Sequence, residues 1–217
     1  NETNHDNLEL YFDMDNSKIV WNEDDTGGKW NRLYDENDHQ IRIDRDLDGY
    51  FSTDGFPEAG VISISKVETA RGWAVELSIP FDSLMMDFNA ANDVVIGFDV
   101  MVGDNDDLGD GDGKKETIIA LFDETNNAWK DASLMGELTL SGETVPTGMM
   151  ETNSVAYTEG NEITLDGDFS DWDQFEQVAL SRFGKGETTD DDLSAVFKTT
   201  FDANSIYFMV EVTDDIA

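Results

Sequence analysis

The sequence contains no cysteine among its 217 residues, and it has only two histidines. The missing thiols exclude disulfides, thiolate metal sites and cysteine nucleophiles. With only His5 and His39 as imidazoles, and with no G-x-S-x-G or H-E-x-x-H motif, few combinations of nucleophile and base remain. Two carboxylates can hydrolyse glycosides, but such a pair can always be found among so many acids. The sequence therefore favours a protein that is not an enzyme.

Positive charge is also scarce, because 13 Lys and Arg face 49 Asp and Glu, for a formal net charge of -36. Such a surface repels nucleic acid and anionic membranes, and no apolar run approaches the roughly 20 residues of a membrane helix. We expect neither nucleic-acid binding nor membrane insertion, and cations are the natural partners. The acids are spread along the chain, which favours a solvated acidic surface for most of them. A high-salt habitat and calcium sites both fit this excess.

Short alternating segments bounded by Gly, Asn and Asp dominate the rest of the sequence. They predict an all-β fold, an antiparallel β-sandwich of jelly-roll type. One short helix is expected at 80–86, with Pro80 at its first position. The predicted strands span 8–15, 39–44, 60–67, 73–80, 93–104, 116–123, 136–142, 162–167, 177–183, 192–202 and 206–213.

A stretch without periodicity, 143–159, contains Pro, Gly, Thr and Asn and is interpreted as a linker. It separates residues 1–142 from residues 160–217, and the second piece is too small to form a stable sandwich alone. Its closing strand, 206–213, needs a neighbour, because an unpaired edge strand favours pairing with other chains.

The segments "ITLDGDFSDW" (163–172) and "AVFKTTFDANSIYFMVEVTDD" (195–215) resemble the opening of a family 9 carbohydrate-binding module. The elements that follow in that family resemble "DNLELYFD" (6–13), "HQIRID" (39–44), "GWAVELSIPFDSL" (72–84), "VIGFDVMVGDND" (95–106), "NNAWKD" (126–131) and "GELTL" (136–140). The last elements of the family thus stand before the first ones, and the resemblance covers nearly the whole chain apart from the linker.

This order implies that residues 160–217 followed by residues 1–142 form one complete β-sandwich. Three origins fit: a circular permutation, a segment of a tandem array that begins within a module, or protomers that exchange residues 160–217. The resemblance implies a non-catalytic carbohydrate-binding module of a secreted or cell-surface protein, with a glycan as partner. The alternative is a structural repeat of an extracellular filament or surface array, a homo-oligomer assembled through residues 160–217.

Sugar recognition requires a flat aromatic face for the pyranose C–H surface and polar side chains for its hydroxyls. By resemblance, Trp129 stands where the family places a sugar-stacking tryptophan. The resemblance also implies a second tryptophan before the strand at 6–13, where this sequence has none, and Trp30 or Trp21 is expected to replace it. Polar candidates for the same cleft, by resemblance or by nearness in the sequence, are Glu9, Arg42 and Asn126.

Two acidic turns are candidate calcium sites, because alternate carboxylates converge on a hard cation and glycine permits the tight bend. In "DRDLDG" the ligands are Asp44, Asp46 and Asp48, although Gly55 occupies the twelfth position, where an EF-hand has an acid. In "DNDDLGDGDG" the crowded carboxylates would repel one another without a cation. Calcium binding by the family adds to this prediction, and the second turn contributes Asp104, Asp106, Asp107, Asp110 and Asp112.

Overall fold

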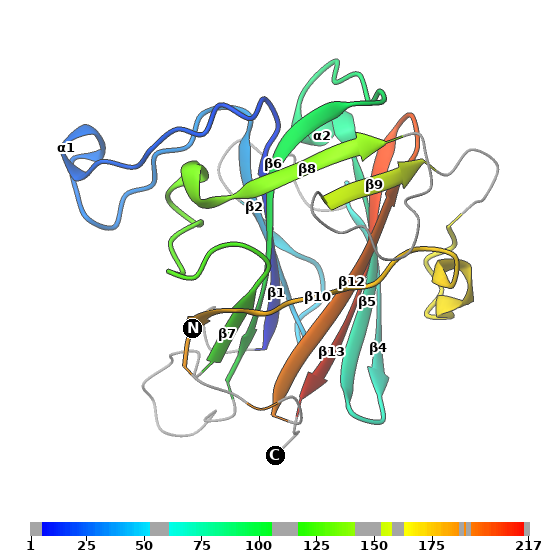
Figure 1. Ribbon diagram of the computed structural model, residues 1–217. Coiled ribbons are helices and arrows are strands. Elements are labelled where there is room, and N and C mark those ends of the chain that lie inside the picture. The colour runs from blue at the N-terminus through cyan, green and yellow to red at the C-terminus, as the bar shows by residue number, and fades with distance from the viewer. Residues whose placement is uncertain are drawn as a thin grey trace.

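The computed structural model describes residues 6–52, 61–105, 117–141, 153–157, 163–186, 189 and 192–214. Their strands form a single hydrogen-bonded path that folds over into two facing layers (Figure 1). Nearly all pairings are antiparallel, so the predicted all-β antiparallel sandwich is confirmed. None of the helices in these residues is long and apolar enough to cross a membrane.

The first layer is built on β1 and β6, which lie side by side with β2 and β3 on one flank and β7 and β8 on the other. Leu8, Leu10 and Phe12 alternate along β1 and are fully buried, as the period of two predicts. The strands of this layer are β1 (Asn7–Asp13), β2 (Asp38–Asp44), β3 (Phe51–Ser52), β6 (Val94–Asp104), β7 (Thr117–Ala120) and β8 (Gly136–Ser141).

The second layer places the last strand of the chain, β13, in the interior of the sheet between β12 and β5, with β4 at the edge. The closing strand therefore finds its neighbour within the same chain, in a register that runs from Ser205 opposite Pro80 to Thr213 opposite Gly72. The strands of this layer are β4 (Ser63–Thr69), β5 (Gly72–Pro80), β10 (Val178–Ala179), β12 (Leu193–Phe201) and β13 (Ser205–Asp214).

Two connections join the layers. β9 (Asn153–Tyr157) pairs in parallel with β8 on one side and with β12 on the other. The segment after β10 crosses the front of the molecule to β11 (Arg182–Lys185), which pairs with β7 (Figure 1). The stretch that the sequence predicts as a linker thus contains a strand, whose pairing comes from distant parts of the chain rather than from a local pattern.

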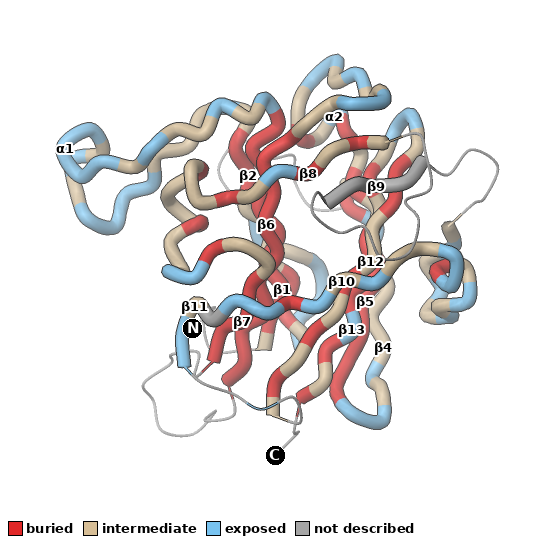
Figure 2. Tube along the Cα trace, in the orientation of Figure 1, coloured by how far each residue is buried: buried red, intermediate tan, exposed pale blue. Residues whose placement is uncertain are grey.

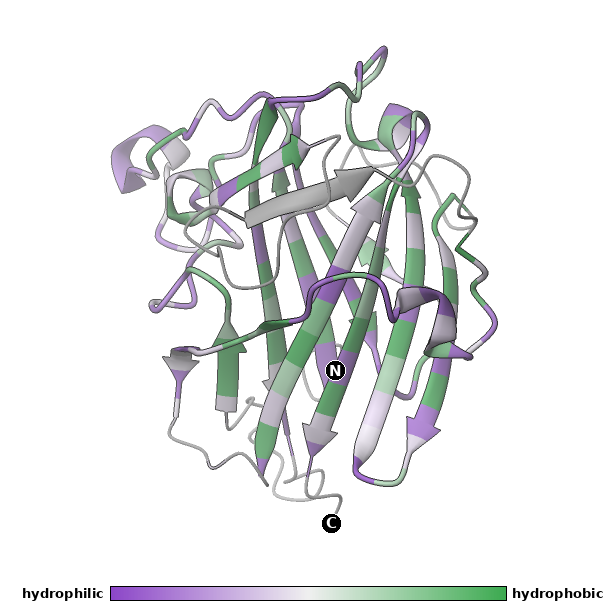
Figure 3. Cartoon of the chain, turned by 45° about the vertical axis from the view of Figure 1, so that its right-hand side comes forward, coloured by the Kyte–Doolittle hydropathy of each residue, from purple (hydrophilic) through white to green (hydrophobic). Residues whose placement is uncertain are grey.

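The layers pack through an aromatic cluster in which each layer contributes phenylalanines. Phe98 of β6 stacks on Phe208 of β13 with ring centroids 5.4 Å apart, and Phe12 of β1 contacts the same two rings. Figure 2 shows the buried residues along the facing strands, and Figure 3 shows hydropathy alternating along several of the longer strands. Apolar burial between two sheets is the main stabilising term of such a fold.

One predicted strand is wrong. Residues 162–167 were expected to form a strand, but the described part of this segment is irregular with a bend at 166–167, and the backbone N–H of Gly167 donates to Glu76. The short helix expected at 80–86 is present as a single turn, α2 (Phe81–Leu84), with Pro80 as its N-cap residue rather than its first helical residue. The other helical turns are α1 (Glu23–Thr26), η1 (Ala132–Leu134) and η2 (Phe169–Trp172).

Glu76 fastens the segment 163–172 to the second layer. Its side chain is fully buried on β5, where it accepts hydrogen bonds from the Trp172 indole N–H (2.9 Å) and from the Gly167 backbone N–H (2.7 Å). A buried carboxylate is stable only when it has such donors, because its desolvation is costly.

We predict that Glu76→Ala lowers the free energy of unfolding by about 3 kcal/mol, since it leaves two buried donors without an acceptor. Urea denaturation followed by tryptophan fluorescence measures the change. The matched control is Glu211→Ala, an exposed glutamate on the neighbouring strand β13, which is expected to change stability by less than about 0.5 kcal/mol. Equal effects of the two substitutions would contradict the prediction.

Candidate functional site

Two loops cover the outer face of the first layer and bring two tryptophans together. The loop between β1 and β2, residues 14–37, carries Trp30, and the loop between β7 and β8, residues 121–135, carries Trp129. Their rings are stacked, with centroids 6.4 Å apart and an angle of 18° between the planes. Trp30 is 72% exposed, whereas Trp129 is half-buried against the cluster around Tyr11. The structure thus sets Trp30 opposite Trp129.

The loop that carries Trp30 is fixed by its own hydrogen bonds. The Asn22 side chain caps α1, and Gly27 ends this helix in the left-handed region, at a φ of 70°. The Asn31 side chain donates to the Thr26 carbonyl (2.9 Å), and the Trp21 indole N–H donates to the Asn31 carbonyl (2.8 Å). Trp21 therefore supports the loop and does not face Trp129.

Contacts between the two loops align their tryptophans. The Leu33 backbone N–H donates to the Lys130 carbonyl (3.0 Å), and the Tyr34 hydroxyl donates to the Ala128 carbonyl. The Lys130 ammonium lies 3.7 Å from the Trp21 ring centroid, a cation–π contact. The two tryptophans are therefore held by contacts within the loop pair.

Two buried aspartates organise the loop that carries Trp129. Asp99 of β6 accepts hydrogen bonds from the backbone N–H groups of Phe122 (3.1 Å) and Asp123 (2.8 Å). Asp123 in turn accepts from the backbone N–H groups of Thr125 (2.7 Å), Asn127 (2.6 Å) and Ala128 (2.7 Å). Each carboxylate replaces the backbone partners that a loop lacks.

Burial raises the pKa of Asp99 to about 7, against the lowering effect of its backbone donors. Burial likewise raises the pKa of Asp38 to about 7. Because these folded-state values exceed the unfolded value of about 3.9, both groups favour folding below about pH 4. That contribution is lost as the pH rises through 7.

Glu9 and Arg42 lie directly opposite each other on β1 and β2. Glu9 shares its face of β1 with Tyr11, which packs in the cluster that Trp129 contacts. The buried Glu9 carboxylate accepts from the Gln40 amide (2.8 Å) and from the Tyr11 hydroxyl. The Arg42 Nε lies 2.9 Å from Asp44, and its guanidinium lies 4.9 Å from the Phe51 ring centroid. Both predicted polar residues are therefore engaged with other side chains, and their role in sugar binding stays a prediction.

Asn126 belongs to the loop that carries Trp129. Its backbone is in the left-handed region, at a φ of 54°, and its Cβ would be 3.4 Å from a Cβ placed at Gly184 of β11. Gln40 and Arg32 were missed from the sequence, where nothing distinguishes them from other surface residues. The Arg32 Nη2 donates to Gln40 (3.2 Å), which links Arg32 to Glu9.

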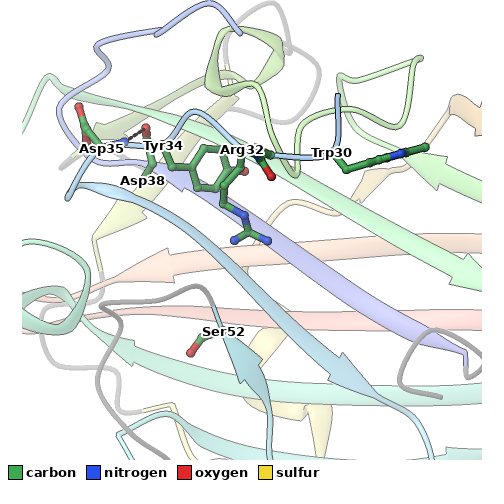
Figure 4. Close-up of a pocket in the computed structure, with 7 residues that line it drawn as sticks. Trp30, Arg32, Tyr34, Asp35, Asp38 and Ser52 are labelled. Atoms are coloured by element: carbon green, nitrogen blue, oxygen red, sulfur yellow. Dashed lines mark hydrogen bonds between the residues drawn. The ribbon is translucent and has the colours of Figure 1, made fainter. Parts of the chain in front are cut away.

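A pocket of about 550 Å³ opens beside Trp30, between the loop 30–38 and the edge strand β3 (Figure 4). Figure 4 shows the Arg32 side chain reaching from the loop toward the side on which Ser52 lies, while Asp35 and Asp38 lie at the far end. The volume is in the range of small-molecule sites. Its lining residues are Trp30, Asn31, Arg32, Tyr34, Asp35, Asp38 and Ser52.

A second cluster lies where the ends of the two layers meet. Asp6, Asp104 and Asp214 have carboxylate oxygens within 4.8 Å of one another, the one such acidic group among the described residues. Arg45 Nη1 contacts Asp214 (2.8 Å) and Asp6 (3.2 Å), so it offsets one of the three negative charges. This acidic triad has the hard oxygen donors and residual negative charge that suit a divalent cation, and it could therefore hold a metal.

The other predicted calcium ligands are placed differently. In the turn after β2, the Lys66 ammonium donates to the backbone carbonyls of Asp44 (2.8 Å), Arg45 (3.0 Å) and Leu47 (2.5 Å). A side-chain cation thus lies in the turn that contains Asp44, Asp46 and Asp48, and calcium binding there stays a prediction. The remaining predicted ligands, Asp106, Asp107, Asp110 and Asp112, lie outside the described residues.

Fold and loops together define a β-sandwich module with an aromatic cleft over one layer. The family model described as "Carbohydrate family 9 binding domain-like" matches residues 1–143 and 165–217. The chain therefore belongs to this family, which confirms the resemblance seen in the sequence.

The chain is similar to parts of much longer proteins that are named as enzymes. The chain is 29% identical over 163 residues to exoglucanase XynX of Acetivibrio thermocellus, which covers 73% of this chain and 12% of that protein. It is 30% identical over 140 residues to endo-1,4-beta-xylanase C of Paenibacillus barcinonensis, which covers 64% of this chain and 11% of that protein. The chain thus spans about a ninth of the length of these relatives.

A solved structure of a family 9 module from Caldicellulosiruptor kristjanssonii in complex with glucose aligns with a TM-score of 0.47 at 21% identity. The alignment covers 67% of this chain and 64% of that one. A second structure of a family 9 module from the same organism, in complex with cellotriose, aligns with a TM-score of 0.46 at 20% identity and covers 67% and 65% of the two chains.

We predict that Asp123→Ala destabilises the protein by about 2–3 kcal/mol and frees the loop that carries Trp129, because three backbone N–H groups lose a charged acceptor. Near-ultraviolet circular dichroism reports the loss of a fixed tryptophan environment. The control is Glu124→Ala, which removes an exposed ion pair with Arg182 and is expected to cost less than about 1 kcal/mol. An unchanged spectrum for Asp123→Ala would refute this role.

Proposed function

We propose that this chain is a non-catalytic carbohydrate-binding module that holds a sugar ring between Trp30 and Trp129. The single observation that carries the proposal is the pair of nearly parallel indole rings at the end of two loops, one of them largely exposed. Flat aromatic faces match the C–H surface of a pyranose ring, and an exposed aromatic pair is typical of a binding site.

The spacing of the rings is close to what a bound sugar needs. A ring in van der Waals contact on both faces requires about 7–8 Å between the two indole planes, twice a carbon–carbon contact of about 3.5–4.0 Å. The ring centroids are 6.4 Å apart, so the planes are at most that far apart and must separate by at least about 0.6–1.6 Å to admit a sugar. Trp30 is exposed and sits on a protruding loop, so a small outward shift of its ring would admit the sugar (Figure 1).

Polar side chains beneath the rings would fix the orientation of the sugar. Glu9 and Arg42, opposite each other across β1 and β2, are proposed to meet hydroxyl groups, together with Gln40 and with Asn126 from the loop of Trp129. Hydroxyl groups that reach this face would exchange with the existing contacts of Glu9 to Gln40 and Tyr11. Such exchange makes recognition dependent on the ligand's own donors and acceptors.

We place this module in an extracellular protein, because its relatives are polysaccharide-degrading enzymes by name, and a glucose or cello-oligosaccharide ligand is the first to test. We further propose that residues 160–217 complete the sandwich of residues 1–142 within one chain. Pairing of β13 with β5 and the Arg45 contacts to both Asp6 and Asp214 support closure in cis. Exchange of the same segment between chains would reproduce these pairings in a filament, which is the structural alternative.

Titration of the protein with glucose and cellotriose is expected to change tryptophan fluorescence saturably. Trp129→Ala and Trp30→Ala should each weaken binding at least tenfold, because each removes one stacking face. The control is Met86→Ala, which removes another exposed apolar side chain, one that follows helix α2 in the sequence. Absence of binding across neutral and charged sugars, with a folded protein, would reject the proposal.

We also propose that the acidic triad, Asp6, Asp104 and Asp214, binds calcium. Calcium takes six to eight oxygen ligands, and carboxylates from three separate segments supply the first of them. An ion there would tie the start of β1, the end of β6 and the end of β13 together. It would stabilise the fold rather than take part in sugar binding.

Chelation with EDTA is expected to lower the melting temperature, and millimolar calcium should restore it where KCl of equal ionic strength does not. Asp104→Asn should reduce the calcium-dependent shift. The matched control is Asp82→Asn on α2, an exposed aspartate away from the triad. Equal rescue by KCl would assign the acidity to salt adaptation instead of a calcium site.

A further inference from the structure

The rare cations of this chain are distributed unevenly. Arg45 contacts three carboxylates, Arg42 contacts Asp44, and Arg182 contacts Glu124. Lys18 and Lys66 donate to backbone carbonyls. In a protein with a net charge of -36, a cation without an acidic partner is therefore unusual.

Three such cations gather around the tryptophan pair. The Lys29 ammonium lies 4.8 Å from the Trp30 ring centroid, and the Lys130 ammonium lies 5.8 Å from that of Trp129. The Arg32 guanidinium lies 5.5 Å from the ring centroid of Tyr34. Within the described residues none of the three forms an ion pair with a carboxylate, so each is available to a negatively charged group of a ligand.

Arg32 is the cation that lines the pocket beside Trp30. It is exposed, it lines the 550 Å³ pocket beside Trp30, and it is the one cationic residue in that lining. The acids of the pocket, Asp35 and Asp38, lie at its far end (Figure 4). There the Asp35 backbone N–H donates to the Asp38 carboxylate (2.9 Å). The Arg32 end of the pocket therefore holds a guanidinium that forms no ion pair among the described residues and that shares the pocket lining with Trp30.

We propose that the pocket beside Trp30 recognises an acidic sugar, a uronic acid unit whose carboxylate pairs with the Arg32 guanidinium. This inference rests on the proposed sugar binding between Trp30 and Trp129 and deepens it. The planar fork of a guanidinium matches a carboxylate through two parallel hydrogen bonds, which a hydroxymethyl group does not reproduce. Lys29 and Lys130 add to the local field without direct contact.

The large negative charge of the molecule does not cancel this preference at physiological salt. The Debye length is then about 8 Å, so distant carboxylates are screened while a contact at hydrogen-bond distance is not. Local charges at the cleft decide the binding of a small anion. Arg32, Lys29 and Lys130 are the positive charges beside the tryptophan pair, whereas Asp35 and Asp38 lie at the other end of the pocket and the acidic residues of α1 lie at the tip of the loop (Figure 1, Figure 4).

The test compares glucose with glucuronate, which differ only in the group at C6, by calorimetry on the full chain in about 0.15 M NaCl. The wild type is expected to bind glucuronate about 3- to 10-fold more tightly than glucose. In Arg32→Gln the ratio of the two dissociation constants should fall to about 1, and Arg32→Lys should keep part of it. Arg182→Gln, which loses an exposed arginine on β11, is the control and should keep the full ratio.

The outcomes separate the two proposals. Binding of glucose with no preference for glucuronate, or a preference that survives in Arg32→Gln, would overturn the acidic-sugar inference and leave sugar binding intact. Binding of neither sugar by the folded wild type would reject both. A preference that is lost with Arg32 and kept with Arg182→Gln establishes the role of Arg32, because a merely structural arginine would change both affinities equally.

Discussion

The fold depends on the contact between its two layers at Phe98 and Phe208, because every other feature is built on strands that this contact fixes. Phe208 belongs to β13, so the last strand of the chain contributes a central part of the core. Its neighbour β5 approaches so closely that a Cβ at Gly72 would lie 2.2 Å from the Val212 carbonyl oxygen, which leaves room for glycine alone. The last strand of the chain thus packs directly against strands from the middle of the sequence.

Buried carboxylates hold several loops in place by accepting hydrogen bonds from their backbone N–H groups or side chains. Glu76 holds the segment before η2, Asp99 and Asp123 hold the loop of Trp129, and Asp13 accepts from the backbone N–H groups of Ser17 and Lys18. The strongly acidic composition is therefore only partly a matter of the surface. Several acids accept hydrogen bonds from backbone N–H groups in loops, where no neighbouring strand provides a carbonyl acceptor.

Alternation of apolar residues predicted most of the strands and the sandwich, because that pattern is local, although β1, β5 and β6 are buried on both faces over most of their length. The strand expected at 162–167 is wrong, since its described part pairs with no strand and the Gly167 backbone N–H donates to the Glu76 side chain instead. The pairing of Trp30 with Trp129 required contacts between loops about 100 residues apart, which sequence spacing does not report. The contact of Lys66 with the turn at 44–48 and the place of Arg32 in the pocket could likewise not be predicted, because both depend on residues distant in the sequence.

The aromatic cleft is assembled by the loop pair, with Leu33, Tyr34 and Lys130 joining one loop to the other above the sheet. Trp129 also packs on the cluster around Tyr11, and Asp99 of β6 accepts from the backbone of its loop, so the placement of this ring depends on the layer beneath it as well as on the loop pair. A substitution at Asp99 or Tyr11 would therefore alter the surface that carries Trp129, although both residues are wholly hidden from solvent.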